Sequence, residues 1–159
     1  MRREQGFTLM EMLIVLVILG ILLGIAVPNY LRWRASMTVM QGAQQFAQAI
    51  SATRTGAKRA NACWRIRLKG DTSKATEYEV QKFSGSSCTG TAASSQSYLL
   101  PRGILIELKS AASTNNVDFL PPYGTVDVGS PNYVVFWKTS SDVKREVRIT
   151  NVLGKVIVK

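Results

Sequence analysis

A single carboxylate stands inside a long apolar segment near the start of the chain. Residues 7–27 are apolar except for Thr8 and Glu11. A helix of this length rises about 1.5 Å per residue and would cover the roughly 30 Å hydrocarbon core of a membrane. A carboxylate inside that core costs on the order of 3 kcal/mol unless it is paired. Glu11 therefore either reaches water at the membrane face or forms an ion pair when subunits assemble.

An amine that could pair with this carboxylate can be made by proteolysis. Arg2 and Arg3 precede the apolar segment and should stay in the cytoplasm, so the rest of the chain would be exported. No small-residue cleavage site of the ordinary secretory kind follows the segment. Cleavage after Gly6 would instead free the α-amino group of Phe7. Among parallel helices, that amine could pair with Glu11 of the neighbouring subunit.

The same residues carry a resemblance to a known family. The stretch GFTLMEMLIVLVILGIL resembles the class III signal of type IV pilins and type II secretion pseudopilins. By this resemblance, residues 1–6 are a leader that a prepilin peptidase removes between Gly6 and Phe7, and the new amine is then methylated. Pro28 matches a proline that is frequent in these helices.

The resemblance also implies where each part of the chain resides. Residues 7–29 would anchor the protein in the inner membrane as a single pass, and would later pack with other pilins or pseudopilins in a filament core. Residues 30–159 would form a periplasmic globular domain, which would become part of a cell-surface or periplasmic filament.

The helix should continue beyond the membrane. Residues that step by three or four form one apolar face of an amphipathic helix. They are Val39, Ala43, Phe46, Ile50 and Thr53. We expect the helix to end near residues 56–60. Pro28 should interrupt it with a kink or local melting, because proline removes a donor and clashes with the preceding turn.

Short strands are expected after the helix, because apolar and polar residues alternate between turn-forming residues. The expected strands are residues 63–69, 77–83, 98–100, 103–108, 117–120, 133–138, 143–150 and 155–159. Residues 84–97 should form an exposed loop and residues 120–124 a turn. With the resemblance, this order predicts an α+β, type IV pilin-like fold, in which a long N-terminal helix, half transmembrane and half amphipathic, packs on antiparallel β-sheets.

Two further stretches resemble the FimT/GspH group of minor pilins. They are VDFLPPYGTVDV and VRITNVLGKVIVK. FimT members bind DNA through a C-terminal Gly-Arg-x-Arg element. This chain departs from that element, because Gly154 is followed by Lys155, Val156 and Ile157. The first cation is a lysine and the second is missing, although Lys159 lies nearby.

Two cysteines, Cys63 and Cys88, are separated by 25 residues. Export would favour a disulfide between them, and two buried free thiols are the alternative. Their spacing is not the Cys-x-x-Cys of a redox-active pair.

The net charge is +10, from 20 Lys and Arg against 10 Asp and Glu. This excess favours a polyanionic partner, such as nucleic acid or an anionic membrane surface, or it reflects only a solvated surface. A first basic group, Arg54, Lys58 and Arg59, lies at the expected helix end. There it could bind an anion or simply oppose the negative end of the helix dipole.

A second basic group consists of Arg65, Arg67 and Lys69, which alternate with apolar residues and should share the solvent side of one strand. Glu77 and Glu79 on the next strand would neutralise much of this group, with Arg67 near Glu79.

A third basic group lies on the expected C-terminal hairpin. Its members on one face are Lys144, Arg148, Lys155 and Lys159, and Arg145 points to the opposite face. A turn at residues 152–153 would place Lys155 opposite Thr150 and Lys159 opposite Glu146. Only Glu146 would then offset the four cations. This face is the best candidate for sequence-independent contacts to the phosphates of double-stranded DNA.

Several function classes have little support. The chain has no histidine, which is the commonest metal ligand and general base. It also has no paired-carboxylate motif and no phosphate-binding glycine loop, so we expect no enzyme, no cofactor and no metal site. The leading hypothesis is a minor pilin or pseudopilin that primes or caps filament assembly. The alternatives are a DNA-binding minor pilin for uptake in natural transformation and a type II secretion minor pseudopilin for protein export.

Overall fold

A computed structural model of the chain describes residues 8–70, 74–109, 115–126, 131–150 and 154–159. The chain divides into two compact units, Met1–Ala35 and Ser36–Lys159. The helix α1 spans Leu9–Ala60 and contributes to both units.

The end of α1 is fixed by a cap. Asn61 adopts a left-handed φ of 46°, and the N–H of Ala62 donates to the carbonyl of Ala57 at 3.2 Å. This is the backward bond of a Schellman motif, which satisfies carbonyls that the last turn leaves free. The helix ends at Ala60, within the range expected from the sequence.

The expectation of local melting at Pro28 is wrong, whereas the expected kink stays a prediction. α1 runs unbroken through Pro28, and every residue from Leu9 to Ala60 is helical. The proline removes one backbone donor from a helix of 52 residues, and the hydrogen bonds on both sides keep the flanking turns in place.

The second half of α1 packs as its periodicity predicted. Val39, Ala43, Phe46, Ile50 and Thr53 are all at most 1% exposed. The hydroxyl of Thr53 donates to the carbonyl of Ala49 at 2.7 Å, so the one polar member of this face is satisfied.

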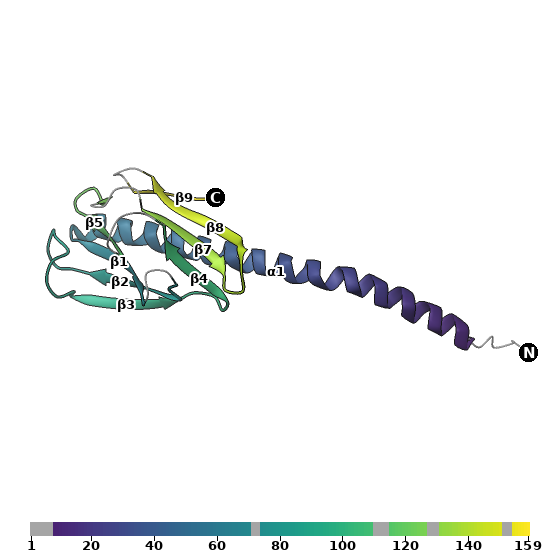
Figure 1. The fold of residues 1–159 in the computed structure, drawn as a ribbon. Coiled ribbons are helices and arrows are strands. Elements are labelled where there is room, and N and C mark those ends of the chain that lie inside the picture. Colours follow the sequence, from purple (N-terminus) through teal and green to yellow (C-terminus); the bar gives the residue numbers. More distant parts are fainter. Residues whose placement is uncertain (1–7, 71–73, 110–114, 127–130, 151–153) are drawn as a thin grey trace, which may run out of the picture. The chain divides into compact units, whose positions relative to one another are not determined.

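Two antiparallel sheets receive this helix face (Figure 1). The first contains β1 (Trp64–Lys69), β2 (Glu77–Lys82), β3 (Ser94–Leu99), β5 (Asn116–Leu120) and β6 (Thr125–Val126) in the order β3-β2-β1-β5-β6. The second contains β4 (Ile104–Leu108), β7 (Asn132–Trp137), β8 (Ser140–Thr150) and β9 (Lys155–Val158) in the order β4-β7-β8-β9. The predicted fold class is confirmed: one long N-terminal helix packs on antiparallel sheets.

Phe46 joins the two sheets through the helix. Its ring meets Tyr78 of β2 at 5.2 Å and Tyr133 of β7 at 5.0 Å, both edge to face. Burial raises the pKa of the Tyr133 phenol well above its usual range. Aromatic pairs of this kind add to the free energy gained by burial.

Three strand expectations need correction. β3 begins at Ser94, although residues 84–97 were expected to form a loop, because pairing with β2 overrides the weak strand propensity of serine. β6 was not expected; it forms a short hairpin with β5 around a cis Pro121–Pro122 bond. β8 starts at Ser140 rather than at residue 143, because it pairs with β7 through a tight turn.

A disulfide joins Cys63 and Cys88, with 5.3 Å between their Cα atoms. Both cysteines are buried and pack with Phe83 in a small apolar cluster apart from the main core. The bond therefore fastens the start of β1 to the segment between β2 and β3.

Removal of this disulfide should lower stability measurably. Closing a loop of 25 residues is worth about 3 kcal/mol in the chain-entropy model. We expect a reductant to lower the free energy of unfolding of the full chain in detergent micelles by about this amount. The Cys63→Ala/Cys88→Ala variant is the control, because its unfolding should not respond to the reductant. An unchanged unfolding curve for the reduced wild-type chain would contradict a stabilising role.

Candidate functional site

The carboxylate of Glu11 lies in the first turn of α1, where Thr8 caps the helix. Its Oε2 accepts from the backbone N–H of Thr8 at 2.9 Å and from the Thr8 hydroxyl at 3.0 Å. In return, the N–H of Glu11 donates to Thr8 Oγ1 at 3.3 Å. This is a capping box, which sequence reasoning missed although the spacing Thr-x-x-Glu indicates it. The predicted processing residues, Gly6 and Phe7, lie outside the described residues.

The capping box changes the physical account of Glu11. Part of its hydrogen-bonding capacity is met inside its own chain, and the helix dipole favours a negative charge at this end. The carboxylate still carries a full charge among side chains that are exposed and apolar from Leu9 onward. A cationic partner from outside the described chain therefore remains its best complement.

The second basic group is largely neutralised, as the sequence predicted. Arg67 lies opposite Glu79 in the β1–β2 ladder, and its Nε is 2.6 Å from Glu79 Oε2. Lys69 Nζ lies 3.5 Å from Glu77 Oε2. These charges face one another across neighbouring strands, so they offer little free positive charge to a ligand.

Arg65 has a partner that sequence reasoning missed. Its Nε and Nη2 each donate to one oxygen of Asp118 at 2.6 Å, and Nη2 also donates to the carbonyl of Cys88 at 2.9 Å. Hydrogen bonding to Asp118 raises the pKa of the Arg65 guanidinium. The alternation of β5 indicates that Asp118 faces solvent, but its pairing with β1 comes from the sheet order.

A cluster of possible metal-ligating atoms surrounds this ion pair but offers no free ligand set. Cys63, Cys88 and Asp118 lie within 4.8 Å of one another. The two sulfur atoms are bonded to each other, and both oxygens of Asp118 accept from Arg65. A metal would need thiolates that the disulfide removes.

The third basic group has the register expected from the sequence. Lys155 pairs with Thr150, and Lys159 exchanges both backbone hydrogen bonds with Glu146. The expected turn at residues 152–153 lies outside the described residues. The members of this group, Lys144, Arg148, Lys155 and Lys159, are exposed on the face of β8 and β9 that points away from α1.

The charge balance of this face needs correction, because it extends onto β4. Val134 pairs with both Glu107 and Glu146, so Glu107 shares the face. Lys109 is a further cation there, and its Nζ lies 3.6 Å from Glu146 Oε1. Arg148 Nη2 lies 3.7 Å from the other oxygen of Glu146. Glu146 is therefore shared by two cations, and a second carboxylate stands nearby.

The first basic group lies against the turn that begins the last strand. A Cβ atom on Gly154 would lie 3.3 Å from Arg54 Cδ, and one on Gly124 would lie 2.9 Å from Arg54 Cγ and 3.2 Å from Lys58 Cε. Both glycines have positive φ, 62° and 69° for Gly124 and Gly154. Because these two turns carry no side chain at Gly124 and Gly154, the end of α1 can lie close to both glycines, and Gly154 directly precedes Lys155.

This contact brings together two basic groups that the sequence analysis treated separately. Arg54 Nε is buried and has no hydrogen-bond partner among the described residues. Lys58, which shares the Gly124 turn with Arg54, is exposed, and so are Arg59 and Lys155. The Nε atom is itself out of reach of a ligand, so any attraction for an anion at this end of the domain comes from the exposed cations.

Glu79 gives this sheet a measurable pH dependence. The Ser95 hydroxyl, followed by Arg67 and Gln81, lowers the pKa of the Glu79 carboxyl below its ordinary value of 4.5. A carboxyl whose pKa is lower in the folded than in the unfolded chain stabilises the fold. This stabilisation is complete above the pKa of the unfolded chain and is lost as the pH falls through the pKa of the folded chain. We expect the free energy of unfolding to fall on acidification below about pH 4.5. Glu79→Gln should flatten that part of the curve, and an identical pH profile for the variant would contradict this role.

The start of the chain matches a family model. Residues 1–27 match the prokaryotic N-terminal methylation motif. Two fimbrial proteins of Pseudomonas aeruginosa are each 34% identical to this chain over 80 residues, which is 50% of this chain and 49% of theirs. The chain thus spans about half the length of the curated relatives it matches.

Solved structures with a similar fold extend over most of the chain. The minor pilin FimU of Pseudomonas aeruginosa matches with a TM-score of 0.61 and 15% identity, over 76% of this chain and 87% of that chain. The minor pseudopilin EpsH of Vibrio cholerae matches with a TM-score of 0.55 and 13% identity, over 76% of this chain and 95% of that chain. At these identities the likeness shows the fold, which is type IV pilin-like.

Proposed function

We propose that this protein is a structural subunit, a minor pilin or pseudopilin, of a type IV pilus-like filament, where it primes or caps assembly. The observation that carries the proposal is the position of Glu11. It is the only charged residue among residues 7–27, where Thr8 is the other polar residue, and the match to the methylation motif covers that segment. The pilin-like fold supports the same role, since FimU is a minor pilin and EpsH a minor pseudopilin.

The first half of α1 has the dimensions of a membrane anchor. It is long and apolar enough to cross a membrane. From Glu11 to Tyr30 the helix rises roughly 28 Å, which is close to the thickness of a hydrocarbon core. Tyr30 and Trp33, both 57% exposed, follow at the level where aromatic residues anchor to the membrane–water interface. A single inner-membrane pass with a periplasmic domain accounts for both features.

Assembly follows from the chemistry of this helix. A prepilin peptidase would cleave between Gly6 and Phe7, and the amine so formed would pair with Glu11 of an adjacent subunit. The apolar side chains exposed along Leu9–Leu31 would then pack against the helices of other pilins or pseudopilins. A structural role of this kind requires no catalytic group.

Substitution of Glu11 tests this role. We expect Glu11→Ala and Glu11→Gln to be cleaved normally but to lose at least about tenfold in filament incorporation, because neither can pair with an amine. Cleavage is read as a change in mass, and incorporation as the amount of subunit in sheared filaments.

Thr8→Ala is the matched control, since it weakens the capping box and keeps the charge. Capping is worth only about 1 kcal/mol, so Thr8→Ala should incorporate far better than Glu11→Gln. Equal losses in the two variants would mean that Glu11 acts only as a helix cap. Normal incorporation of Glu11→Ala would overturn the proposed role.

A second candidate function, capture of double-stranded DNA during uptake, is favoured by the contact between Arg54 and Gly154. Arg54 lies beside both Gly124 and Gly154, Lys58 also lies beside Gly124, and Lys155 directly follows Gly154 in the chain. Phosphates could accept from these cations without any contact to bases, which suits DNA of arbitrary sequence.

Salt dependence tests the DNA hypothesis. Four phosphate contacts predict a slope of roughly −3.6 for log affinity against log salt. Lys58→Glu/Lys155→Glu should reduce the slope to roughly −1.8 or abolish binding. Lys74→Glu/Lys138→Glu makes the same change of charge at exposed lysines elsewhere and should leave the slope nearly unchanged. No binding of duplex DNA at low salt, or equal effects of the two double variants, would reject this function.

A further inference from the structure

The strand β3 is an unprotected edge of the first sheet. It lies at one end of the order β3-β2-β1-β5-β6, and all six of its residues are exposed. Its sequence, SSQSYL, contains no charge and no proline. By contrast, the edge strand β9 of the second sheet is flanked by Lys155 and Lys159, and charges of this kind discourage pairing with other chains. β3 lacks such protection.

Two residues of β3 present free backbone groups at this edge. The N–H of Leu100 donates to the carbonyl of Thr76 at 3.1 Å. Because hydrogen-bonded pairs alternate with non-hydrogen-bonded pairs, this bond shows which residues of β3 bond to β2. The backbone groups of Gln96 and Tyr98 therefore bond to β2, whereas those of Ser95 and Ser97 point away from β2, toward the open edge. At the far end of the edge, Gln45 Nε2 from α1 already donates to the carbonyl of Leu99 at 3.2 Å.

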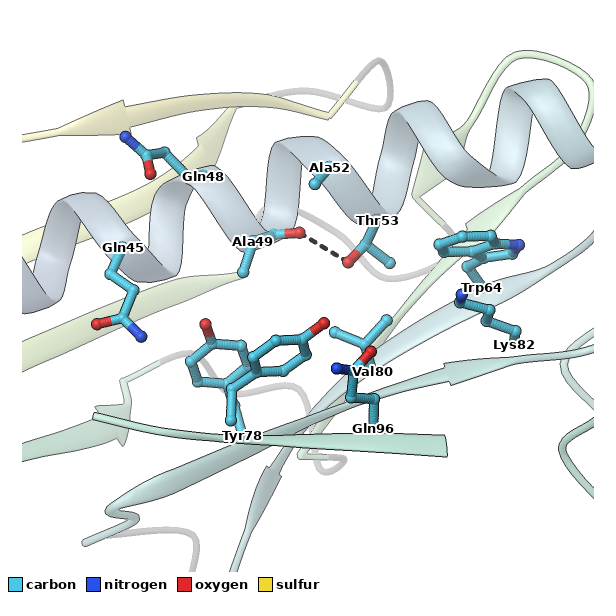
Figure 2. A pocket seen from close by; sticks show the side chains of 11 residues that line it. Gln45, Gln48, Ala49, Ala52, Thr53, Trp64, Tyr78, Val80, Lys82 and Gln96 are labelled. Carbon is cyan, nitrogen blue, oxygen red and sulfur yellow. Dashed lines mark hydrogen bonds between the residues drawn. The ribbon is translucent and has the colours of Figure 1, made fainter. Parts of the chain in front are cut away.

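A cleft of about 410 Å³ opens beside this edge, between α1 and the inner face of the sheet. Figure 2 shows Ala49 and Ala52 on the helix above Tyr78 and Val80 on the sheet. The two alanines leave space that larger side chains would fill. Gln48 and Gln96 also line the cleft and can supply hydrogen bonds to an occupant.

The geometry of a ladder connects the edge to the cleft. In a strand added to β3, residues paired with Ser95 and Ser97 would point to the outer face of the sheet. Residues opposite Gln96 and Tyr98 would point to the inner face, where the cleft lies. An added strand would therefore place alternate side chains in a cavity that is lined mainly by apolar groups.

The charge of the cleft selects the occupant. Lys82 is the only charged residue among the described residues that line it, and Lys82 lies opposite Ser94 in the β2–β3 ladder. Its Nζ stands 4.6 Å from the centroid of the Trp64 ring. The short side chain of Ser94 leaves Lys82 accessible to a group on an added strand. An acidic side chain at that end would find a cation and no competing carboxylate in the lining.

We propose that β3 and the cleft beside it bind an extended segment of another protein by strand addition. The segment runs antiparallel to β3, carries apolar side chains at alternate positions, and bears an acidic side chain at its C-terminal end, beside Lys82. Main-chain hydrogen bonds to Ser95 and Ser97 provide the docking, and the cleft selects the side chains. This interaction is independent of assembly through α1.

A defined peptide tests the proposal. Ac-Val-Thr-Val-Thr-Asp-NH₂ places valines opposite Tyr98 and Gln96 and its aspartate opposite Ser94. We expect it to bind the ¹⁵N-labelled full chain in detergent micelles and to slow hydrogen exchange at the amides of Ser95 and Ser97. A lack of binding would overturn the proposal. So would protection that appears at Val156 and Val158 of β9 and not at β3.

Variants of the edge separate strand addition from other modes of binding. Ser97→Pro removes an outward N–H and leaves the hydrogen bonds between β2 and β3 intact, so it should lower the affinity for the peptide by about tenfold. Ser97→Ala keeps that N–H and should bind like the wild type. Equal affinity of Ser97→Pro and Ser97→Ala would exclude pairing at this edge.

The role of Lys82 is tested with a second peptide. In Ac-Val-Thr-Val-Thr-Asn-NH₂ the acid is replaced by its neutral amide. Lys82→Gln should lower the affinity for the aspartate peptide by about fivefold at low salt and leave the affinity for the asparagine peptide unchanged. If Lys82→Gln affects both peptides equally, the acidic end of the segment does not lie beside Lys82.

Discussion

The packing of one helix face against two sheets is the constraint on which the folded unit depends. Phe46 meets an aromatic ring from each sheet, Tyr78 on β2 and Tyr133 on β7. An isolated β-bridge between Ala75 and Ile106 also connects the two sheets, and side chains of both sheets share one buried core with the helix. The helix therefore transmits a change in either sheet to the other. This arrangement also explains why residues of the helix face are at most 1% exposed while Met40, Gln44, Gln48 and Ser51 on the other side of α1 remain in solvent.

The sequence predicted those features that repeat locally. The buried helix face follows from apolar residues that recur every three to four positions. The alternation of strand residues, with a period of two, predicted that Arg67 lies opposite Glu79 and that Lys155 pairs with Thr150. The start of β3 at Ser94 does not follow, because a serine-rich strand exists only through its partner. Local patterns also do not predict the order of the strands in each sheet. For the same reason they miss the ion pair of Arg65 with Asp118 and the approach of Arg54 to Gly154, which join residues far apart in the sequence.

The positive charge of the chain is distributed unequally once the fold is known. On β1, each cation has a carboxylate from a neighbouring strand within 3.5 Å, and the outer face of that sheet is close to neutral. On β8 and β9, carboxylates are fewer and their contacts longer, at 3.6 and 3.7 Å. Among the described residues, no ion pair includes Arg54, Lys58 or Arg59 at the end of α1, where the helix dipole already favours cations. Structural and ligand-binding uses of these residues are compatible there.

The capping box has a consequence for the order in which the protein matures. Thr8 caps α1, and the helix begins at Leu9. The N–H of Met12 donates to the carbonyl of Thr8 at 3.3 Å, so the cap is complete within the described residues. Under the proposed cleavage between Gly6 and Phe7, no residue of this cap would be removed. The anchor would keep its cap after cleavage, and only the new terminus would remain to be positioned in the growing structure.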